Sequence, residues 1–148
     1  PQHVQKSCFK FTHFFTHHAF HVALPHVYTH SIKNILDIGG NTGKWAIESV
    51  NHSPEIHVTI MDLPGQLNVA KTKIEDLGLQ ERVSFISANI LDESVKIPKG
   101  FDAIWMSQFL DCFSESVLKL QHFVCNRLPF ILPQQQMVTA RCTVLKLF

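Results

Sequence analysis

The chain has 148 residues, which is enough for one domain with a buried core. Its 13 Lys and Arg residues nearly balance its 12 Asp and Glu residues and form no basic run. This balance excludes the electrostatic footprint that binding to nucleic acid or to an anionic membrane requires. The four cysteines form no C-x-x-C pair and accompany no signal peptide or long apolar span. We therefore expect reduced thiols in a cytoplasmic protein, with disulfide pairing as the less favoured alternative.

The first segment, residues 1–30, is rich in Phe and His. His13, His17 and His21 recur every four residues, which would place three imidazoles along one face of a helix. A metal site is one interpretation of this spacing. Ligands on a single solvated face do not converge on a closed tetrahedral site, and no carboxylate or cysteine joins them, so no metal is predicted. A helix from about Ala19 to Thr29 would pack against the start of the first strand and have a structural role.

The stretch from Asn34 to Trp45 predicts a buried strand that turns sharply into a helix. Apolar residues lead into Asp37, and Gly39, Gly40 and Gly43 follow before a new amphipathic run begins. Glycine allows the backbone to adopt positive φ and to approach a ligand, while the free N–H groups of the helix start face the same crevice. The turn therefore predicts a nucleotide-binding site.

The spacing of this turn disfavours ligands that carry phosphate groups. A dinucleotide fingerprint G-x-G-x-x-G that began at Gly39 would need glycine where the chain has Asn41 and Lys44. A phosphate loop fails as well, because Gly43 and Lys44 are followed by Trp45 rather than by a hydroxyl residue. NAD, ATP and GTP are disfavoured, and the pattern that remains is D-x-G-G-x-T-G.

The residues after the turn alternate between helical and strand periodicity. The predicted elements are a helix at 45–50, a strand at 55–61, a helix at 67–77 that ends at Gly78, and strands at 83–87 and 101–106. This order predicts an α/β fold with a Rossmann-like, doubly wound and mainly parallel sheet that is only partly complete, preceded by a helical N-terminal segment.

Polar residues follow two of the predicted strands. Asp62 ends the second strand, beside the glycine turn in a right-handed βαβ unit, where its carboxylate can accept hydrogen bonds from both hydroxyls of a ribose. An acid that merely starts a turn is the alternative. Asn89 follows the third strand and can bond the edge of a base, with Ile90 or Leu91 against the face of the base. The alternative is an ordinary Asn turn with a core aliphatic residue.

Four motifs occur in the order and spacing of a known family. They are Asp37–Gly43, Met61–Pro64, Ala88–Leu91 and Phe101–Ser114. Together they resemble the small-molecule O-methyltransferase family of class I S-adenosylmethionine (SAM)-dependent methyltransferases, which includes caffeate and hydroxyindole enzymes, and the chain looks closest to bacterial members. The resemblance covers roughly residues 14–115. It implies that SAM is the cofactor and that the reaction is methyl transfer to the hydroxyl of a small molecule.

The resemblance also implies where SAM would bind. The implied cofactor-binding residues are Asp37, Gly39, Gly40, Gly43, Asp62, Leu63, Asn89 and Ile90, with Ser107 and Gln108 near the methionyl end. Plant members have a histidine as general base after the fourth strand, and the matching residue here is Asp111. An aspartate with an ordinary pKa of about 4 is a poor base for a phenol of about 10 unless burial raises it. Asp111 as base, as a residue that orients the acceptor, or as a helix cap are three open interpretations.

The likeness divides the chain into three parts. These are a helical N-terminal segment (1–30), a SAM-binding Rossmann-like domain (31–115) and an atypical C-terminal tail (116–148). In the family, a further helix, a Gly-Lys-Val-Ile-like strand and an antiparallel strand pair follow, and none of these is recognisable in the tail. The tail instead predicts a loop at 127–136 and one apolar strand at 137–148, whose place in the sheet is open.

Two functional interpretations follow from this division. The chain is a SAM-dependent O-methyltransferase, or it is a SAM-binding fragment or inactive remnant without an acceptor pocket. Truncation, or a change of reading frame after about Ser114, would explain the tail. The expected partner is a small-molecule acceptor, with no nucleic acid and no membrane, and a homodimer is an open alternative to a monomer.

Overall fold

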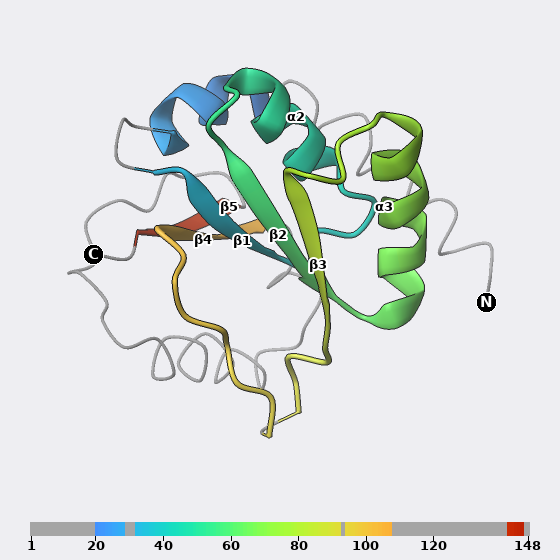
Figure 1. The fold of residues 1–148 in the computed structure, drawn as a ribbon. Coiled ribbons are helices and arrows are strands. Elements are labelled where there is room, and N and C mark those ends of the chain that lie inside the picture. The colour runs from blue at the N-terminus through green and yellow to red at the C-terminus, as the bar shows by residue number, and fades with distance from the viewer. Residues whose placement is uncertain (1–19, 29–31, 93, 108–141, 147–148) are drawn as a thin grey trace.

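The computed structural model describes residues 20–28, 32–92, 94–107 and 142–146, which form a five-stranded sheet with helices (Figure 1). The strands lie in the order β3-β2-β1-β4-β5. They are β1 (Asn34–Ile38), β2 (His57–Asp62), β3 (Val83–Ser87), β4 (Ala103–Ser107) and β5 (Cys142–Lys146). The first four strands are parallel, and β5 pairs antiparallel with β4. This arrangement confirms the Rossmann-like, mainly parallel fold that the sequence predicts.

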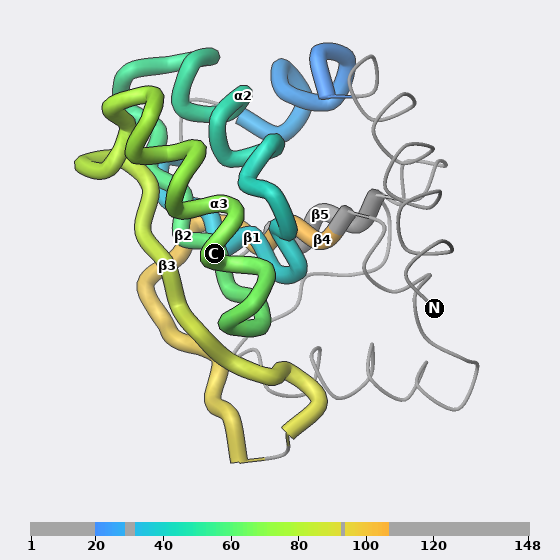
Figure 2. Tube along the Cα trace, turned by 90° about the vertical axis from the view of Figure 1, so that its right-hand side faces the viewer, coloured from blue at the N-terminus to red at the C-terminus, as the bar shows by residue number. Residues whose placement is uncertain are grey.

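The helices of the described residues lie on one face of the sheet. They are α2 (Lys44–His52), α3 (Pro64–Asp76) and a helical stretch at 20–27. Figure 1 shows these helices on one side of the strands and the connection from β3 to β4 on the other. Figure 2, turned by 90°, shows α2 and the helical stretch at 20–27 above the strands and the connection below them. The β1-α2-β2 and β2-α3-β3 crossovers account for the shared face, because successive right-handed crossovers in one direction keep their helices together.

Alternation along the strands divides the core between the two faces. On the helical face, α2 and α3 pack through residues such as Ala46 and Ile74 against Val58 and Ile60 of β2. The strand residues that alternate with Val58 and Ile60 and their counterparts in the other strands point to the opposite face, where they pack against the β3–β4 connection. That cluster contains Leu36, Ile38, Met61, Ile90, Ile104 and Met106. Both faces of the sheet are therefore apolar, and this is why the parallel strands appear in the sequence as continuous runs of hydrophobic residues.

The N-terminal helix has the structural role that its pattern predicts. Phe20, Leu24 and Val27 are buried in a cluster with Trp45 and Trp105, on the helical face beside β1 and β4. The helix covers the part of the sheet that α2 and α3 leave open.

Several element boundaries differ by one to three residues from those predicted. Helix α3 begins at Pro64, three residues before the predicted start at Leu67. Proline after a strand suggests a turn, but here it occupies the first helical turn, where its fixed φ suits the helix and its missing N–H is not needed. Gly78 follows the helix with a φ of 67° and donates its N–H to the Glu75 carbonyl, as the glycine stop predicts. Of the strand predicted at 137–148, the structure describes residues 142–146, which form β5.

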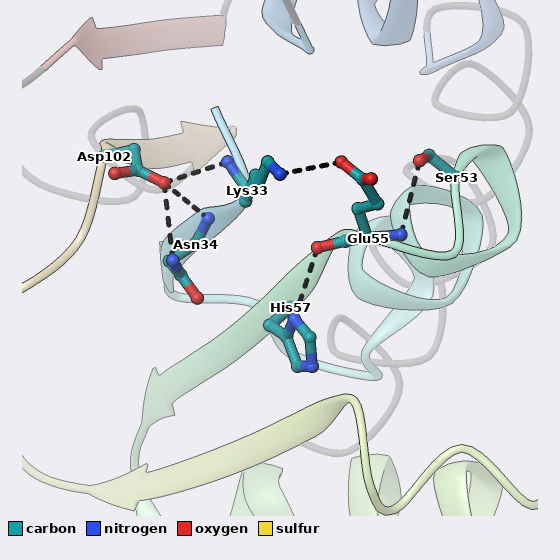
Figure 3. Close-up of polar contacts among 6 residues, drawn as sticks. All are labelled: Lys33, Asn34, Ser53, Glu55, His57 and Asp102. Carbon is teal, nitrogen blue, oxygen red and sulfur yellow. Dashed lines mark hydrogen bonds and ion pairs between the residues drawn. The ribbon is translucent and has the colours of Figure 1, made fainter. Parts of the chain in front are cut away.

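A polar cluster ties the amino-terminal ends of the strands together (Figure 3). The Asp102 Oδ2 atom accepts hydrogen bonds from the backbone N–H groups of Lys33, at 2.9 Å, and Asn34, at 2.7 Å. The Lys33 ammonium forms an ion pair of 2.9 Å with Glu55, which lowers the pKa of that carboxyl group. Asp102 precedes β4 and Asn34 begins β1, so this carboxylate fixes the start of the β1–β4 pair.

Within the described ranges, no helix is long and apolar enough to cross a membrane. The same ranges contain no group of three or more His, Cys, Asp or Glu side chains that could hold a metal ion. His13 and His17 lie outside them.

Candidate functional site: the carboxyl ends of the parallel strands

The carboxyl ends of the first three strands lie side by side. The Gly39 N–H, just after β1, donates to the Met61 carbonyl of β2 at 2.9 Å, and the Ala88 N–H, just after β3, donates to the Asp62 carbonyl at 3.0 Å. These bonds extend the parallel ladders by one residue past the strands. They bring the glycine turn, Asp62 and the segment after β3 to one edge, which is the usual place for ligands in open α/β sheets.

The glycine turn repeatedly uses left-handed backbone conformations. The φ angles of Gly39, Asn41 and Gly43 are 73°, 49° and 72°, and only glycine and, at lower frequency, residues such as Asn adopt them readily. Gly43 closes the turn by donating its N–H to the Gly40 carbonyl at 2.9 Å, and its own carbonyl accepts the Ile47 N–H in the first turn of α2. The turn and the helix start are therefore one hydrogen-bonded unit.

Gly40 is required for a different reason. A Cβ atom added there would lie 2.5 Å from the Asp37 Oδ2 atom and 2.8 Å from the Ile60 Cγ2 atom. Both distances are below van der Waals contact, so the backbone of the turn lies directly against the floor formed by Asp37 and Ile60.

Asp62 connects the tip of β2 to the glycine turn. Its Oδ2 atom accepts the Asn41 backbone N–H at 2.9 Å, and its Oδ1 atom accepts the Leu63 N–H at 2.7 Å. Each carboxylate oxygen has two lone pairs, so one acceptor position on each oxygen remains for a ligand. The structure therefore places Asp62 beside the turn as predicted, already oriented by the backbone.

Asp37 lies beneath the turn and is 2% exposed. In the sheet register it stands between Ile60 of β2 and Trp105 of β4, and its Oδ2 atom is buried without a hydrogen-bond partner. Burial, with a smaller effect from the negative charge of Asp62, raises the pKa of Asp37 from 3.8 to about 8. A buried carboxyl group of this kind either holds a proton or needs a positive charge beside it.

Asn89 and the two aliphatic residues after it differ in how far their side chains are buried. The Asn89 side chain is exposed and its Oδ1 atom accepts the Leu91 N–H at 3.1 Å, which forms a local Asn turn. Ile90 is 6% exposed and packs in the core against the sheet, whereas Leu91 is 44% exposed. Of the two residues considered for contact with a base, Leu91 is the one whose side chain is accessible.

The remaining predicted site residues follow β4. Ser107 is the last residue of β4, and its backbone pairs with Cys142 of β5. Gln108 and Asp111 lie outside the described residues. Leu63, between Asp62 and α3, is 48% exposed at the same edge as the turn.

Asn41 is the residue that the sequence analysis did not assign to the site. It was considered only as a departure from the dinucleotide fingerprint, yet its backbone bonds Asp62 and its side-chain Oδ1 atom is buried without a partner. The available signal was its type, because asparagine is among the few residues other than glycine that tolerate positive φ inside such a turn.

The arrangement favours a particular class of ligand. Its available groups are the remaining acceptor positions of Asp62, the unpartnered oxygen of Asp37 and that of Asn41. Hydrogen-bond acceptors and carboxyl groups suit a ligand with hydroxyl or ammonium donors and a positive charge. They do not suit the negative charge of a phosphate.

The comparison with protein families agrees with this chemistry. The model of the O-methyltransferase domain matches residues 16–137 of the chain. The chain belongs to this family. The match extends past the 14–115 stretch indicated by the four motifs and includes part of the C-terminal tail.

Curated relatives match this O-methyltransferase domain over part of their length. The O-methyltransferase FrzF of Cladobotryum sp is 30% identical over 90 residues, which cover 61% of this chain and 20% of that protein. The 3-hydroxy-5-methyl-1-naphthoate 3-O-methyltransferase of Streptomyces sahachiroi is 29% identical over 85 residues, or 57% of this chain and 24% of that enzyme. The chain therefore spans between a fifth and a quarter of the length of these two relatives.

Solved structures confirm the fold. The SAM-dependent methyltransferase SibL in its apo form is 31% identical, with a TM-score of 0.57, over 65% of this chain and 28% of that one. LaPhzM gives a TM-score of 0.64 at 19% identity over 82% of this chain and 39% of that one, a likeness that supports the fold alone.

Proposed function

We propose that this O-methyltransferase domain binds SAM at the carboxyl edge of its sheet, as part of an enzyme that methylates a hydroxyl group of a small molecule. The chemistry supplied by SAM is an activated methyl group on a sulfonium. The protein would contribute binding, alignment of the acceptor oxygen and removal of the hydroxyl proton.

The observation that supports this proposal most directly is the set of acceptors at the glycine turn. SAM carries ribose hydroxyls, an ammonium group and a sulfonium. It therefore offers hydrogen-bond donors and a positive charge as partners for the carboxyl groups of Asp62 and Asp37. A phosphate-bearing nucleotide would instead bring its negative charge towards the Asp62 carboxylate. The residues present therefore fit SAM better than NAD or ATP.

The other predicted residues also have roles in this proposal. Asp62 would accept hydrogen bonds from the ribose hydroxyls through its free lone pairs. Asn89 would bond the edge of the adenine with Leu91 against the face of the base, while Ile90 supports the segment from the core. Gly39, Gly40 and Gly43 would allow the backbone to approach the ligand, and Leu63, Ser107 and Gln108 would complete the pocket, with the last two near the methionyl end.

Thermal unfolding of the chain with SAM or S-adenosylhomocysteine (SAH) tests the proposal. A ligand that binds only the folded state stabilises it by about 2.7 kcal/mol at a hundredfold excess over Kd, which would raise Tm by several degrees. We expect such a rise with SAM and SAH, and none with NAD or ATP. Asp62→Ala should remove most of it, whereas Asp76→Ala, at the exposed far end of α3, should leave it unchanged.

A folded chain that shows no rise in Tm at millimolar SAM would contradict the cofactor assignment. A rise with NAD equal to that with SAM would point to a general nucleotide site instead.

Methyl transfer needs a separate test because the alternative is a domain that binds SAM without an acceptor pocket. Transfer of a radiolabelled methyl group to a panel of phenols and hydroxyindoles separates the two. Activity lost in Asp111→Asn, with SAH binding retained, would support Asp111 as the base. A cytoplasmic location and a homodimer remain predictions from the sequence.

A further inference from the structure

Asn41 is fixed beside Asp62 by its own backbone. Its N–H donates to the Asp62 Oδ2 atom at 2.9 Å, and its φ of 49° places it in the left-handed region between Gly40 and Thr42. The hydrogen bond and the backbone angle together determine where the Asn41 side chain leaves the turn. The Asn41 side chain therefore leaves the backbone next to the Asp62 carboxylate at the tip of β2.

The oxygen of the Asn41 carboxamide is not used by the fold. Its Oδ1 atom is buried and has no hydrogen-bond partner, although the residue as a whole is only partly buried. A buried acceptor without a donor is unfavourable, and the great majority of such atoms in folded proteins are paired with protein or with bound molecules. The terminal torsion of asparagine is broad, so the group can turn towards a donor that arrives at the edge of the turn.

We propose that the Asn41 carboxamide is a ligand-binding group, which accepts a hydrogen bond from a hydroxyl or ammonium donor of the nucleoside ligand. The inference rests on the proposed SAM site and adds a contact that neither the sequence motifs nor the family match assigns. Asp62 positions this group through the backbone bond and contacts the ligand through its remaining lone pairs. One carboxylate thus serves both the turn and the ligand, and Asn41 supplies a second acceptor.

The variant Asn41→Gly tests this contact cleanly. Glycine adopts a φ of 49° without strain and keeps the backbone N–H that bonds Asp62, so only the carboxamide is lost. We expect the Kd of SAH, measured by isothermal titration calorimetry, to rise about three- to tenfold, the range expected for one hydrogen bond. The thermal stability without ligand should be unchanged or higher. Asn51→Ala, which removes an exposed carboxamide near the end of α2, should leave the Kd unchanged.

Analogues of SAH identify the donor. If a ribose hydroxyl is the partner, the loss of affinity in Asn41→Gly should disappear with the deoxy analogue that lacks that hydroxyl. If the ammonium is the partner, the loss should disappear with the deaminated analogue. A loss that persists with every analogue, or an unchanged Kd for SAH in Asn41→Gly, would overturn the inference while leaving the SAM site intact. Failure of the wild-type chain to bind SAH would overturn the proposed function as well.

A measurement on the wild-type chain covers the case in which the variant does not fold. In a ¹⁵N-correlated NMR spectrum, the side-chain amide signals of Asn41 should shift when SAH is added, whereas those of Asn51 should not. Unshifted Asn41 signals at saturating SAH would also overturn the inference.

Discussion

Asp37 couples the stability of the folded chain to pH. Its carboxyl group is buried beneath the glycine turn, and its pKa rises from 3.8 to about 8 chiefly because of that burial. Between these two values the folded chain holds a proton that the unfolded chain has released. Stability therefore falls as pH rises through this window and levels off above about 8.

Asp37→Asn should remove this pH dependence. The amide has nearly the same shape and no charge, so the free energy of unfolding of the variant should lack the fall of up to about 1.4 kcal/mol per pH unit that Asp37 contributes. Urea unfolding of both proteins at several pH values between 4 and 9 measures the difference. We expect the variant to be the more stable protein at the alkaline end.

The contrast between the two proteins is the control, because all other titrating groups are shared. Parallel stability curves for wild type and Asp37→Asn across this range would show that Asp37 ionises normally in the folded chain.

Gly40 is a position where one methyl group should disrupt the site. Gly40→Ala would place a Cβ atom 2.5 Å from the Asp37 Oδ2 atom and 2.8 Å from Ile60, so the turn must move away from the sheet. Overpacking of this kind costs about 1–3 kcal/mol of unfolding free energy. Urea unfolding should show this loss, and SAH should bind more weakly because the displaced turn carries the ligand contacts.

Gly65→Ala, in the next crossover along the chain, provides the matched control. Nothing lies within 4 Å of a Cβ atom at Gly65, which is in the first turn of α3, and alanine favours helix over glycine. This variant should be as stable as the wild type or more stable. Equal destabilisation by both substitutions would indicate that glycine itself, and not the close packing, matters at Gly40.

At the scale of elements, Asp102 holds the start of β4 against the start of β1. Asp102→Ala leaves the backbone N–H groups of Lys33 and Asn34 without their acceptor, which should cost about 1–2 kcal/mol of unfolding free energy in this partly exposed location. Hydrogen exchange should speed up for these two amides more than for amides of β2 and β3. The effect should be local because the cluster lies at the amino-terminal ends of the strands, away from the glycine turn.

Lys33→Ala removes only the exposed ion pair with Glu55 and keeps the backbone N–H. Water and salt screen exposed ion pairs, so they contribute little to stability and this variant should lose less than Asp102→Ala. A larger loss in Lys33→Ala would mean that the ion pair, and not the carboxylate–backbone bonds, ties these strand ends together.

Most elements could be predicted from sequence because their signals are local. The strand at Val83–Ser87 was predicted with its observed bounds, and α3 ends before Gly78 as its glycine stop indicates. The start of α3 was missed since Pro64 is compatible with both a turn and a first helical turn. The antiparallel pairing of β5 with β4 could not be predicted, because register and neighbours depend on contacts between residues far apart in the chain.

The site itself was predictable only in part. Asp37 lies near the end of β1 and Asp62 ends β2, in a recognisable pattern, so their position at one edge follows from topology. The assignment of Ile90 to the core and Leu91 to the surface depends on how the segment after β3 leaves the sheet, which no local pattern encodes. The same is true of the unpartnered Asn41 carboxamide, which becomes visible only when every nearby donor has been placed.

At the scale of the whole molecule, four parallel strands bring the first three motifs to one edge, with β4 beside β1. The O-methyltransferase family match and the solved relatives agree with this arrangement, over a chain that spans about a fifth to a quarter of two curated relatives. The sheet therefore accounts for a cofactor site more fully than for an acceptor site.

The stacked indoles on the helical face give the chain an optical property. Trp45, in the first turn of α2, lies over Trp105 of β4 with ring centroids 3.8 Å apart and planes at 6°. Trp105 is also the β4 neighbour of Asp37 in the sheet register. Two indole chromophores at this separation share their electronic excitation, so their circular dichroism should contain a paired positive and negative band. The sign and size of that couplet would report, without any attached dye, how closely the start of α2 lies against the floor of the site.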